Sequence, residues 1–155
     1  MEEAIKLIHR QRIACRQLKD FLDELKAALQ QKMDARRLRE AVKHVESMFG
    51  EISRLGEEQD QFLEARQQQN MVSFVQAQPD SVERDVAMRL LFQLGELQKQ
   101  LSGQMMAAGE LLRHSQEFVA FQVNMQAQAK AGDLYGPPGA AGGAHGGSRM
   151  FDANV

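Results

Sequence analysis

Apolar positions along the proline-free first half of the chain recur three and four residues apart and do not alternate. This spacing is typical of amphipathic helices and not of strands. The first apolar stripe has one polar member, Gln11. Its apolar members are Ile8, Cys15, Leu18, Leu22, Leu25 and Leu29. We therefore expect a first long helix over about residues 2–32, of the kind that packs against other long helices.

A second stripe follows Asp34, whose carboxylate can accept hydrogen bonds from the free amides of a first helical turn. We place the turn of a helical hairpin there. The members of the stripe are Leu38, Val42, Val45, Phe49, Ile52, Gly56, Gln59 and Leu63. Gly50 and Gly56 lie inside this helix, where a glycine weakens the helix locally or lets a neighbouring segment approach closely. The helix is expected over about 34–77, although the polar run 67–70 interrupts the stripe and leaves its end open.

A third helix is expected as one continuous element over about residues 81–129. Pro79 ends the second helix, and Asp80 or Ser81 can cap the third. At 1.5 Å per residue the third helix would be roughly 70 Å long, and helices of that length pack side by side. Its stripe reads Ala87, Leu90, Leu94, Leu97, Leu101, Gln104, Ala108, Leu111, Ser115, Phe118, Gln122 and Met125. The predicted fold class is all-α, with long antiparallel helices forming a coiled-coil-like hairpin or bundle over residues 1–130.

Residues 131–155 differ in composition from the helical part. A glycine-rich spacer, residues 136–149, separates two apolar anchors, Leu134-Tyr135 and Met150-Phe151. Helix or strand formation in the spacer would carry a large entropic cost, so we expect a flexible tail. Two interpretations stay open: the aromatic residues are docking points on a tether, or the segment is a frayed terminus with incidental aromatics.

The third predicted helix carries more apolar residues than one stripe needs. The additional residues are Met88, Phe92, Met105, Met106, Leu112, Val119, Phe121 and Val123. One partner helix would not cover them all, and an uncovered remainder would mark a protein-binding surface or a homo-oligomer contact. Methionine suits such a surface because its side chain is unbranched and polarisable. The alternative is that the additional residues simply pack against the first two helices.

Composition and charge argue against membrane and nucleic-acid binding. The chain has 155 residues, enough for one domain, and a formal net charge of −2. Its best basic cluster has acidic neighbours on both sides, which favours a solvated helix face over a phosphate-binding track. The cluster consists of Arg36, Arg37 and Arg39, and a helical regulator that binds nucleic acid through it is the weaker alternative. Without a signal peptide or an apolar run of membrane-spanning length, the chain is expected to be cytoplasmic.

No arrangement of residues for catalysis or metal binding emerges from the sequence. The four histidines lie on separate segments, and none is three or four residues from another. The single cysteine, Cys15, excludes an internal disulfide and falls on an apolar stripe, where burial is favoured over reactivity. Carboxylate pairs such as Glu57-Glu58 lie on polar helix faces. We expect no enzyme, no catalytic residue, no cofactor and no metal.

The end of the third predicted helix and the tail resemble a known family. Residues 111–125 read Leu-Leu-Arg-His-Ser-Gln-Glu-Phe-Val-Ala-Phe-Gln-Val-Asn-Met, followed by Leu-Tyr-Gly-Pro-Pro-Gly at 134–139 and Phe-Asp-Ala at 151–153. In order and spacing, these segments resemble the FlgN family of flagellar type III export chaperones. With the first helix and the turn at Met33-Asp34, the resemblance covers nearly the whole chain. One departure is Ala108, where many members carry asparagine.

The resemblance implies a cytosolic chaperone, independent of nucleotide, for hook-filament junction proteins of the FlgK and FlgL type. Such a chaperone holds an aggregation-prone C-terminal helix of its client in a groove and delivers the client to the export gate. It also implies that Tyr135 docks on the cytoplasmic domain of the gate protein FlhA. We expect the groove to be lined by Leu111, Leu112, Ser115, Phe118, Val119, Gln122 and Met125. Phe151 is the expected tail anchor, and with Tyr135 it could cover the empty groove until a client displaces both.

A protein of another class would also account for the pattern. In a homo-oligomeric structural coiled coil without a client, a second copy would cover the surplus apolar face. A homodimer is equally compatible with a chaperone. The sequence leaves these alternatives open.

Overall fold

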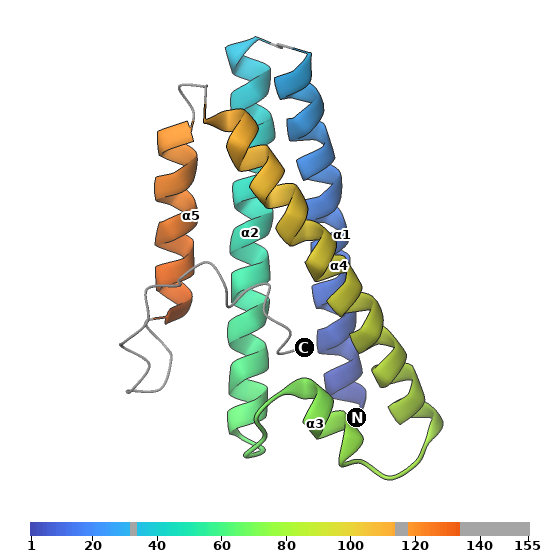
Figure 1. Cartoon of the computed structure of the whole chain (residues 1–155). Coiled ribbons are helices and arrows are strands. Elements are labelled where there is room, and N and C mark those ends of the chain that lie inside the picture. Colours follow the sequence, from blue (N-terminus) through green and yellow to red (C-terminus); the bar gives the residue numbers. More distant parts are fainter. Residues whose placement is uncertain (32–33, 114–117, 134–155) are drawn as a thin grey trace.

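The structure is a computed structural model that describes residues 1–31, 34–113 and 118–133 (Figure 1). Every regular element in these ranges is an α-helix. The helices are α1 (Glu2–Gln30), α2 (Ala35–Glu64), α3 (Met71–Gln76), α4 (Val82–Leu112) and α5 (Phe118–Asp133). The all-α fold class is confirmed. Of the predicted flexible tail over 131–155, residues 131–133 belong to α5, and the rest lies outside the described residues.

The first two helices form the antiparallel hairpin that the sequence predicted (Figure 1). Asp34 caps α2, and its carboxylate accepts a hydrogen bond from the backbone N–H of Arg37 at 2.9 Å. The apolar stripe of α1 is withdrawn from solvent at Ile8, Cys15, Leu18, Leu22 and Leu25. The facing stripe of α2 buries Val42, Val45, Phe49, Ile52, Leu55, Phe62 and Leu63. Most members of both predicted stripes are therefore core, whereas Leu29, Leu38, Gly56 and Gln59 are only partly buried.

Polar contacts set the register of the hairpin. Gln11, the polar member of the first stripe, is buried, and its Nε2 donates to the backbone carbonyl of Leu55 across 3.4 Å. At the open end of the hairpin, Arg66 lies 2.8 Å from the carboxylate of Glu3. A shift of α1 along α2 would leave the buried amide of Gln11 without this hydrogen bond, among apolar neighbours. Gln11 therefore disfavours other registers of the hairpin.

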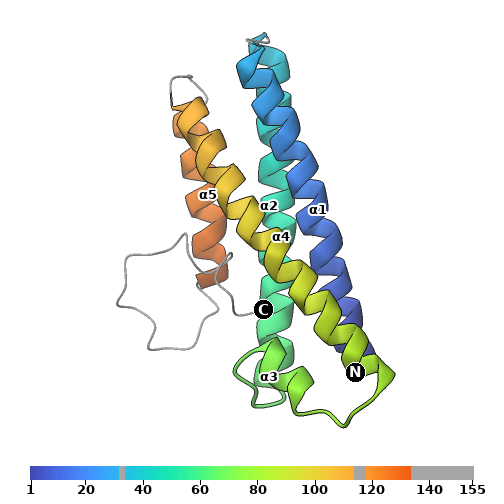
Figure 2. The same ribbon diagram turned by 45° about the vertical axis from the view of Figure 1, so that its right-hand side comes forward.

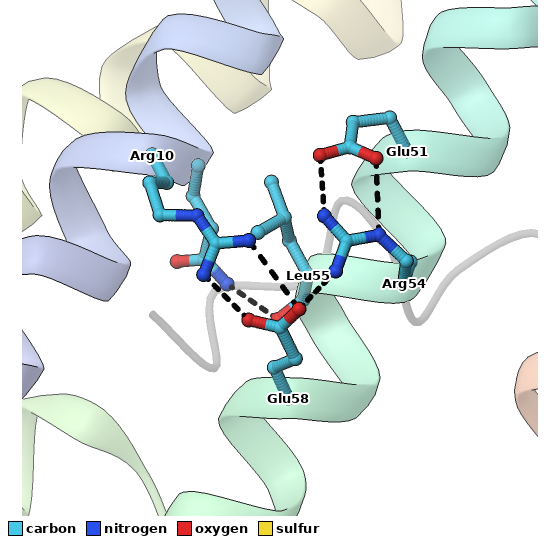
Figure 3. Close-up of polar contacts among 6 residues, drawn as sticks. Arg10, Glu51, Arg54, Leu55 and Glu58 are labelled. Atoms are coloured by element: carbon cyan, nitrogen blue, oxygen red, sulfur yellow. Dashed lines mark hydrogen bonds and ion pairs between the residues drawn. The ribbon is translucent and has the colours of Figure 1, made fainter.

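A chain of four charged residues connects the two helices at the surface (Figure 3). Arg10 on α1 donates to the carboxylate of Glu58 on α2 at 2.7 Å. Glu58 also accepts from Arg54, which binds Glu51 at 2.6 Å. Exposed pairs of this kind each contribute little, about 0–1 kcal/mol, but a linked set favours one alignment of the helices.

The helix α4 packs along α1 and runs parallel to it. Arg12 donates to Gln93, and Gln104 donates to Asp23 at 3.1 Å, both across a sequence separation of 81. Figures 1 and 2 show α4 crossing in front of α1. The buried residues of α4 are Ala87, Leu91, Leu94, Leu101, Ala108 and Leu112. The central helix of the fold is therefore α1, with α2 and α4 packed against it.

The predicted second helix over 34–77 is two helices. α2 ends at Glu64, and the next residues lie beside the first turn of α1, where Arg66 meets Glu3. Gln67 has a φ of 54°, a left-handed conformation that turns the chain away from the helix axis. Beyond this point α1 offers no further surface for an apolar stripe, so α2 ends there.

The short helix α3 closes this end of the core. Asn70 caps it and accepts from the backbone N–H of Ser73 at 2.8 Å. The ring of Phe74 meets that of Phe62 edge to face at a centroid distance of 5.1 Å. The buried residues of α3 are Met71, Phe74 and Val75. The apolar run that the sequence assigned to the second helix thus covers the end of the bundle.

The predicted third helix over 81–129 is also two helices. Of the two predicted caps it is Ser81 that caps α4, accepting from the backbone N–H of Arg84 at 3.2 Å. The helix α4 ends at Leu112 and does not continue to residue 129. Instead, α5 lies against α2 and runs parallel to it (Figure 2).

Leu101 and Leu111 provide a matched test of the packing of α4. Leu101 is fully buried, whereas Leu111 is 39% exposed. We expect Leu101→Ala to lower the free energy of unfolding by about 2–5 kcal/mol, because it leaves a cavity against α1. Leu111→Ala should lower it by less than about 1 kcal/mol. Urea unfolding followed by far-ultraviolet circular dichroism measures both, and equal losses would contradict this packing.

The charge chain should make stability depend on pH. The hydrogen bond from Arg10 lowers the pKa of Glu58 below its ordinary value of 4.5, and the hydrogen bond from Arg54 lowers the pKa of Glu51. A carboxylate with a lowered folded-state pKa adds stability above its unfolded pKa, and this is lost as pH falls through the folded value. The melting temperature of Glu58→Gln should therefore fall less than that of the unsubstituted protein on acidification below about pH 4.5. Glu57→Gln is the control, and an acid response of Glu58→Gln identical to that of the control would rule out the linkage.

Candidate functional site

The residues predicted to line a client groove are divided between two helices that run in opposite directions. The prediction that they form one stripe on one continuous helix is therefore wrong. Leu111 and Leu112 belong to the end of α4. Those on α5 are Phe118, Val119, Gln122 and Met125. Ser115, Tyr135 and Phe151 lie outside the described residues.

The two leucines at the end of α4 have different environments. Leu112 is fully buried and belongs to the core, whereas Leu111 is exposed. On α5, Gln122 is exposed and Met125 is partly buried against the core. Leu111 and Gln122 are thus open to a partner. A partner could reach Leu112 only if α4 moved relative to α1.

A shallow depression of about 560 Å³ lies at the C-terminal end of α4. Its described lining combines apolar side chains, Ala107 and Leu111, with one acidic and one basic residue, Glu110 and Arg113. Met106, which precedes this lining in α4, is 70% exposed. The combination of apolar surface with one charge of each sign suits an amphipathic protein segment.

The helix α5 docks on α2 through a small set of contacts. Phe121 is buried at this contact, and Asn124 Nδ2 donates to the carboxylate of Glu46 at 2.9 Å. Gln128 Nε2 donates to the backbone carbonyl of the same glutamate at 3.2 Å, while its Oε1 is buried without a partner among the described residues. α5 is therefore joined to α2 largely through side-chain amides.

Gly50 lets α5 approach α2 closely. A Cβ at this position would lie 3.0 Å from Gln128 Oε1, whereas a Cβ at Gly56 would meet nothing within 4 Å. Of the two roles predicted for helix glycines, close approach therefore applies to Gly50. The sequence pattern pointed to Gly50 as a position of close approach. Nothing in it pointed to Gln128 or Glu46 as the residues that make the contact between α5 and α2.

Several surplus apolar residues remain uncovered, as the sequence predicted. Phe92 is 71% exposed on α4, and Val123 is 58% exposed on α5. Others serve the core, because Phe121 is buried and Met88 and Met105 pack partly against it. Both predicted interpretations hold in part: some of the surplus is additional core and some is open surface.

The titratable groups do not assemble into a reactive centre within the described ranges. Burial raises the pKa of the Cys15 thiol to about 12, which keeps it protonated and unreactive. No group of three potential metal ligands occurs among the described residues. In the predicted basic cluster, Arg36 is exposed and lies 3.8 Å from Glu40. None of the described helices has the length and apolar character that crossing a membrane requires.

An exposed apolar surface on a helical bundle is what a protein-binding role needs. The family model described as FlgN protein matches residues 1–143. The chain belongs to the FlgN family. FlgN proteins are flagellar export chaperones that bind flagellar hook-associated proteins. Comparisons with curated proteins and with solved structures give no match.

Membership in the FlgN family gives the exposed residues a context. As a family of chaperones and not of enzymes, FlgN proteins act through binding surfaces. In this FlgN protein two of the exposed apolar residues, Leu111 on α4 and Val123 on α5, lie within the segment that carried the resemblance, and Met106 precedes it by five positions.

The docking of α5 can be tested with the two glycines of α2. Gly56→Ala should raise the free energy of unfolding by roughly 0.5–1 kcal/mol, because alanine favours helix and the added methyl group meets open space. Gly50→Ala should gain less and should speed amide hydrogen exchange in α5, because the methyl group displaces Gln128. Denaturant unfolding and hydrogen exchange measure the two effects. Identical behaviour of both variants would argue against the contact between α5 and Gly50.

Proposed function

We propose that this FlgN protein is a cytosolic chaperone for a hook-filament junction protein of the FlgK or FlgL type. It binds the C-terminal helical region of the client, prevents its aggregation and delivers it to the export gate. The proposal rests mainly on the uncovered apolar surface at the C-terminal end of α4, where Met106 and Leu111 flank the depression. This surface includes Leu111, the first residue of the segment 111–125 that carried the family resemblance.

The chemistry of the surface fits an amphipathic helix. A client whose terminal helices become buried only on assembly exposes an apolar helix face in the cytosol. Such a face can lie on Ala107 and Leu111, which are four residues apart in the lining of the depression, while Glu110 and Arg113 pair with charges along its edges. The flexible thioether side chain of methionine adapts to clients of different sequence.

The helix α5 would supply the second part of the client site. Phe121 and Met125 face the core in the client-free arrangement, and the amides of Asn124 and Gln128 hold α5 on α2. A client that binds the detached form of α5 more tightly shifts the equilibrium toward it. Phe121 and Met125 then pack against the client, which takes the place of α2 beside them.

Delivery to the gate is assigned to Tyr135 by the family resemblance. This residue follows Asp133, the last residue of α5, by two positions. A gate protein of the FlhA type that binds Tyr135 would therefore be brought close to a client bound at α4 and α5. The expected tail anchor, Phe151, belongs to the same proposal.

Calorimetry with a synthetic C-terminal helical segment of FlgK or FlgL from the same organism tests client binding. We expect stoichiometric binding, weakened at least about tenfold by Leu111→Asp, because the substitution places a charge in the apolar contact. Val82→Asp is the matched control, since Val82 is 76% exposed at the opposite end of α4. This control should bind as the unsubstituted protein does.

A further variant separates the client from the gate. Tyr135→Ala should leave the affinity for the client segment unchanged and should abolish binding of the FlhA cytoplasmic domain. If the unsubstituted protein binds neither segment, or if Leu111→Asp and Val82→Asp bind equally well, the proposed client site is wrong.

A further inference from the structure

The most exposed aromatic side chain among the described residues is Phe92 in the middle of α4, 71% of which is open to solvent. One turn earlier, Met88 is partly buried against the core. One turn later, a Cβ at Gly95 would meet nothing within 4 Å, so there is open space beside the ring. We call these three residues the Phe92 patch. Figures 1 and 2 show no described helix in front of α4, so the patch is free to take an occupant.

Contacts between α5 and α2 fix the level at which the chain leaves α5. The two helices run parallel, and Gln128 of α5 lies against Gly50 of α2. Asp133, the last residue of α5, is five positions beyond Gln128, and Leu55 is five positions beyond Gly50. The end of α5 therefore lies at the level of Leu55.

Two hydrogen bonds connect this level with Phe92. The backbone carbonyl of Leu55 accepts from Gln11 of α1, and the next residue of α1, Arg12, donates to Gln93 of α4. Gln93 is the neighbour of Phe92 in the chain. Packed helices have axes about 8–10 Å apart, so the three steps from α5 through α2 and α1 to α4 span at most about 24–30 Å.

The chain after α5 has the length to cross this span. Its apolar anchor Met150-Phe151 begins 17 positions after Asp133. A flexible glycine-rich chain of that length, as the sequence predicts, has a root-mean-square end-to-end distance of about 21–25 Å and a full extension of about 56–61 Å. Tyr135, two positions after Asp133, reaches only about 7 Å. Such a tether gives the second anchor a millimolar effective concentration at the patch, so a weak contact is sufficient for docking.

Charges on both sides of the anchor match the charges on both sides of Phe92 in one direction. Arg149 precedes the anchor and Asp152 follows it, whereas Arg89 precedes Phe92 by one turn and Glu96 follows by one turn. An extended segment over 149–152 covers about 10 Å, and the helix from Arg89 to Glu96 covers about 10.5 Å. When the segment runs antiparallel to α4, Asp152 lies beside Arg89 and Arg149 beside Glu96. The parallel direction places like charges together.

The two charges on α4 are open to such partners. Arg89 is exposed and forms no ion pair within the part of the chain that the structure describes. Glu96 is also exposed, and its carboxylate lies 3.0 Å from the ammonium group of Lys99 on the same helix. A carboxylate has two oxygens and can accept from Lys99 and from an arginine at once.

We propose that the occupant of the Phe92 patch is the C-terminal end of this same chain, with Phe151 on Phe92, Asp152 beside Arg89 and Arg149 beside Glu96. This seat differs from the client groove in which the tail was expected to lie, because Leu111 is about 28 Å further along α4. The docked tail shields the patch from water and leaves the client surface open. The proposal does not rest on the proposed function, since it is tested without client or gate protein.

Tryptophan fluorescence tests the docking, because the chain contains no tryptophan of its own. Phe92→Trp keeps an aromatic surface at an exposed position and reports on its cover. In this background Phe151→Ala should raise the acrylamide quenching constant at least about twofold, because loss of the ring opens the indole to water. Tyr135→Ala removes the other aromatic residue of the tail and is the matched control, which should leave quenching unchanged.

Charge reversal tests the direction of the docked segment. In the Phe92→Trp background, Arg89→Glu should raise quenching, because it sets two carboxylates side by side. The further substitution Asp152→Arg should restore the original value. Arg16→Glu, at an exposed position on α1, is the control and should have no effect.

Three results would overturn the proposal. The first is equal quenching with and without Phe151, which would leave the tail away from the patch. The second is protection that disappears on dilution from about 50 to 1 µM, because docking within one chain does not depend on concentration. The third is a failure of Asp152→Arg to restore protection in the Arg89→Glu protein, which would contradict the antiparallel direction.

Discussion

In this fold α1 has its apolar residues buried against two helices at once, α2 and α4. Ile8, Leu18, Leu22 and Leu25 are almost completely withdrawn from water, each contributing on the order of 1.5–3 kcal/mol of transfer free energy. Gln11 is accommodated in the same stripe because its amide donates to the carbonyl of Leu55. Most of the stability of a helix in a protein comes from the packing of its apolar face, so α2 and α4 depend on this shared partner.

The extent of α1 also sets the ends of its neighbours. α2 ends at Glu64, and the chain after it lies beside the first turn of α1, where Arg66 meets Glu3. The chain beyond each end folds back, as α3 over one end of the core and as α5 along α2. The helix α5, which carries most of the segment that resembles the family, is consequently joined to the core by few contacts.

The region of the candidate site could be predicted from the sequence, but its geometry could not. A surplus of apolar residues predicted an uncovered surface, and Phe92 and Met106 are uncovered. Leu111 and Leu112 looked equivalent, yet one is exposed and the other buried, because the position of α1 decides which side of α4 faces inward. The contact of α5 with Gly50 joins segments almost eighty residues apart, and no local pattern reports such a pairing.

Local pattern was sufficient for the helical class, the hairpin turn at Asp34 and the buried stripes, because periodicity and capping depend on neighbouring residues. The order of short motifs was likewise sufficient for the family. The separation of α4 from α5 had no such signal, because residues 113–117 contain neither glycine nor proline. The end of such a helix depends on the helices that cover its apolar face. Those helices come from distant parts of the chain, so a local pattern does not reveal the end.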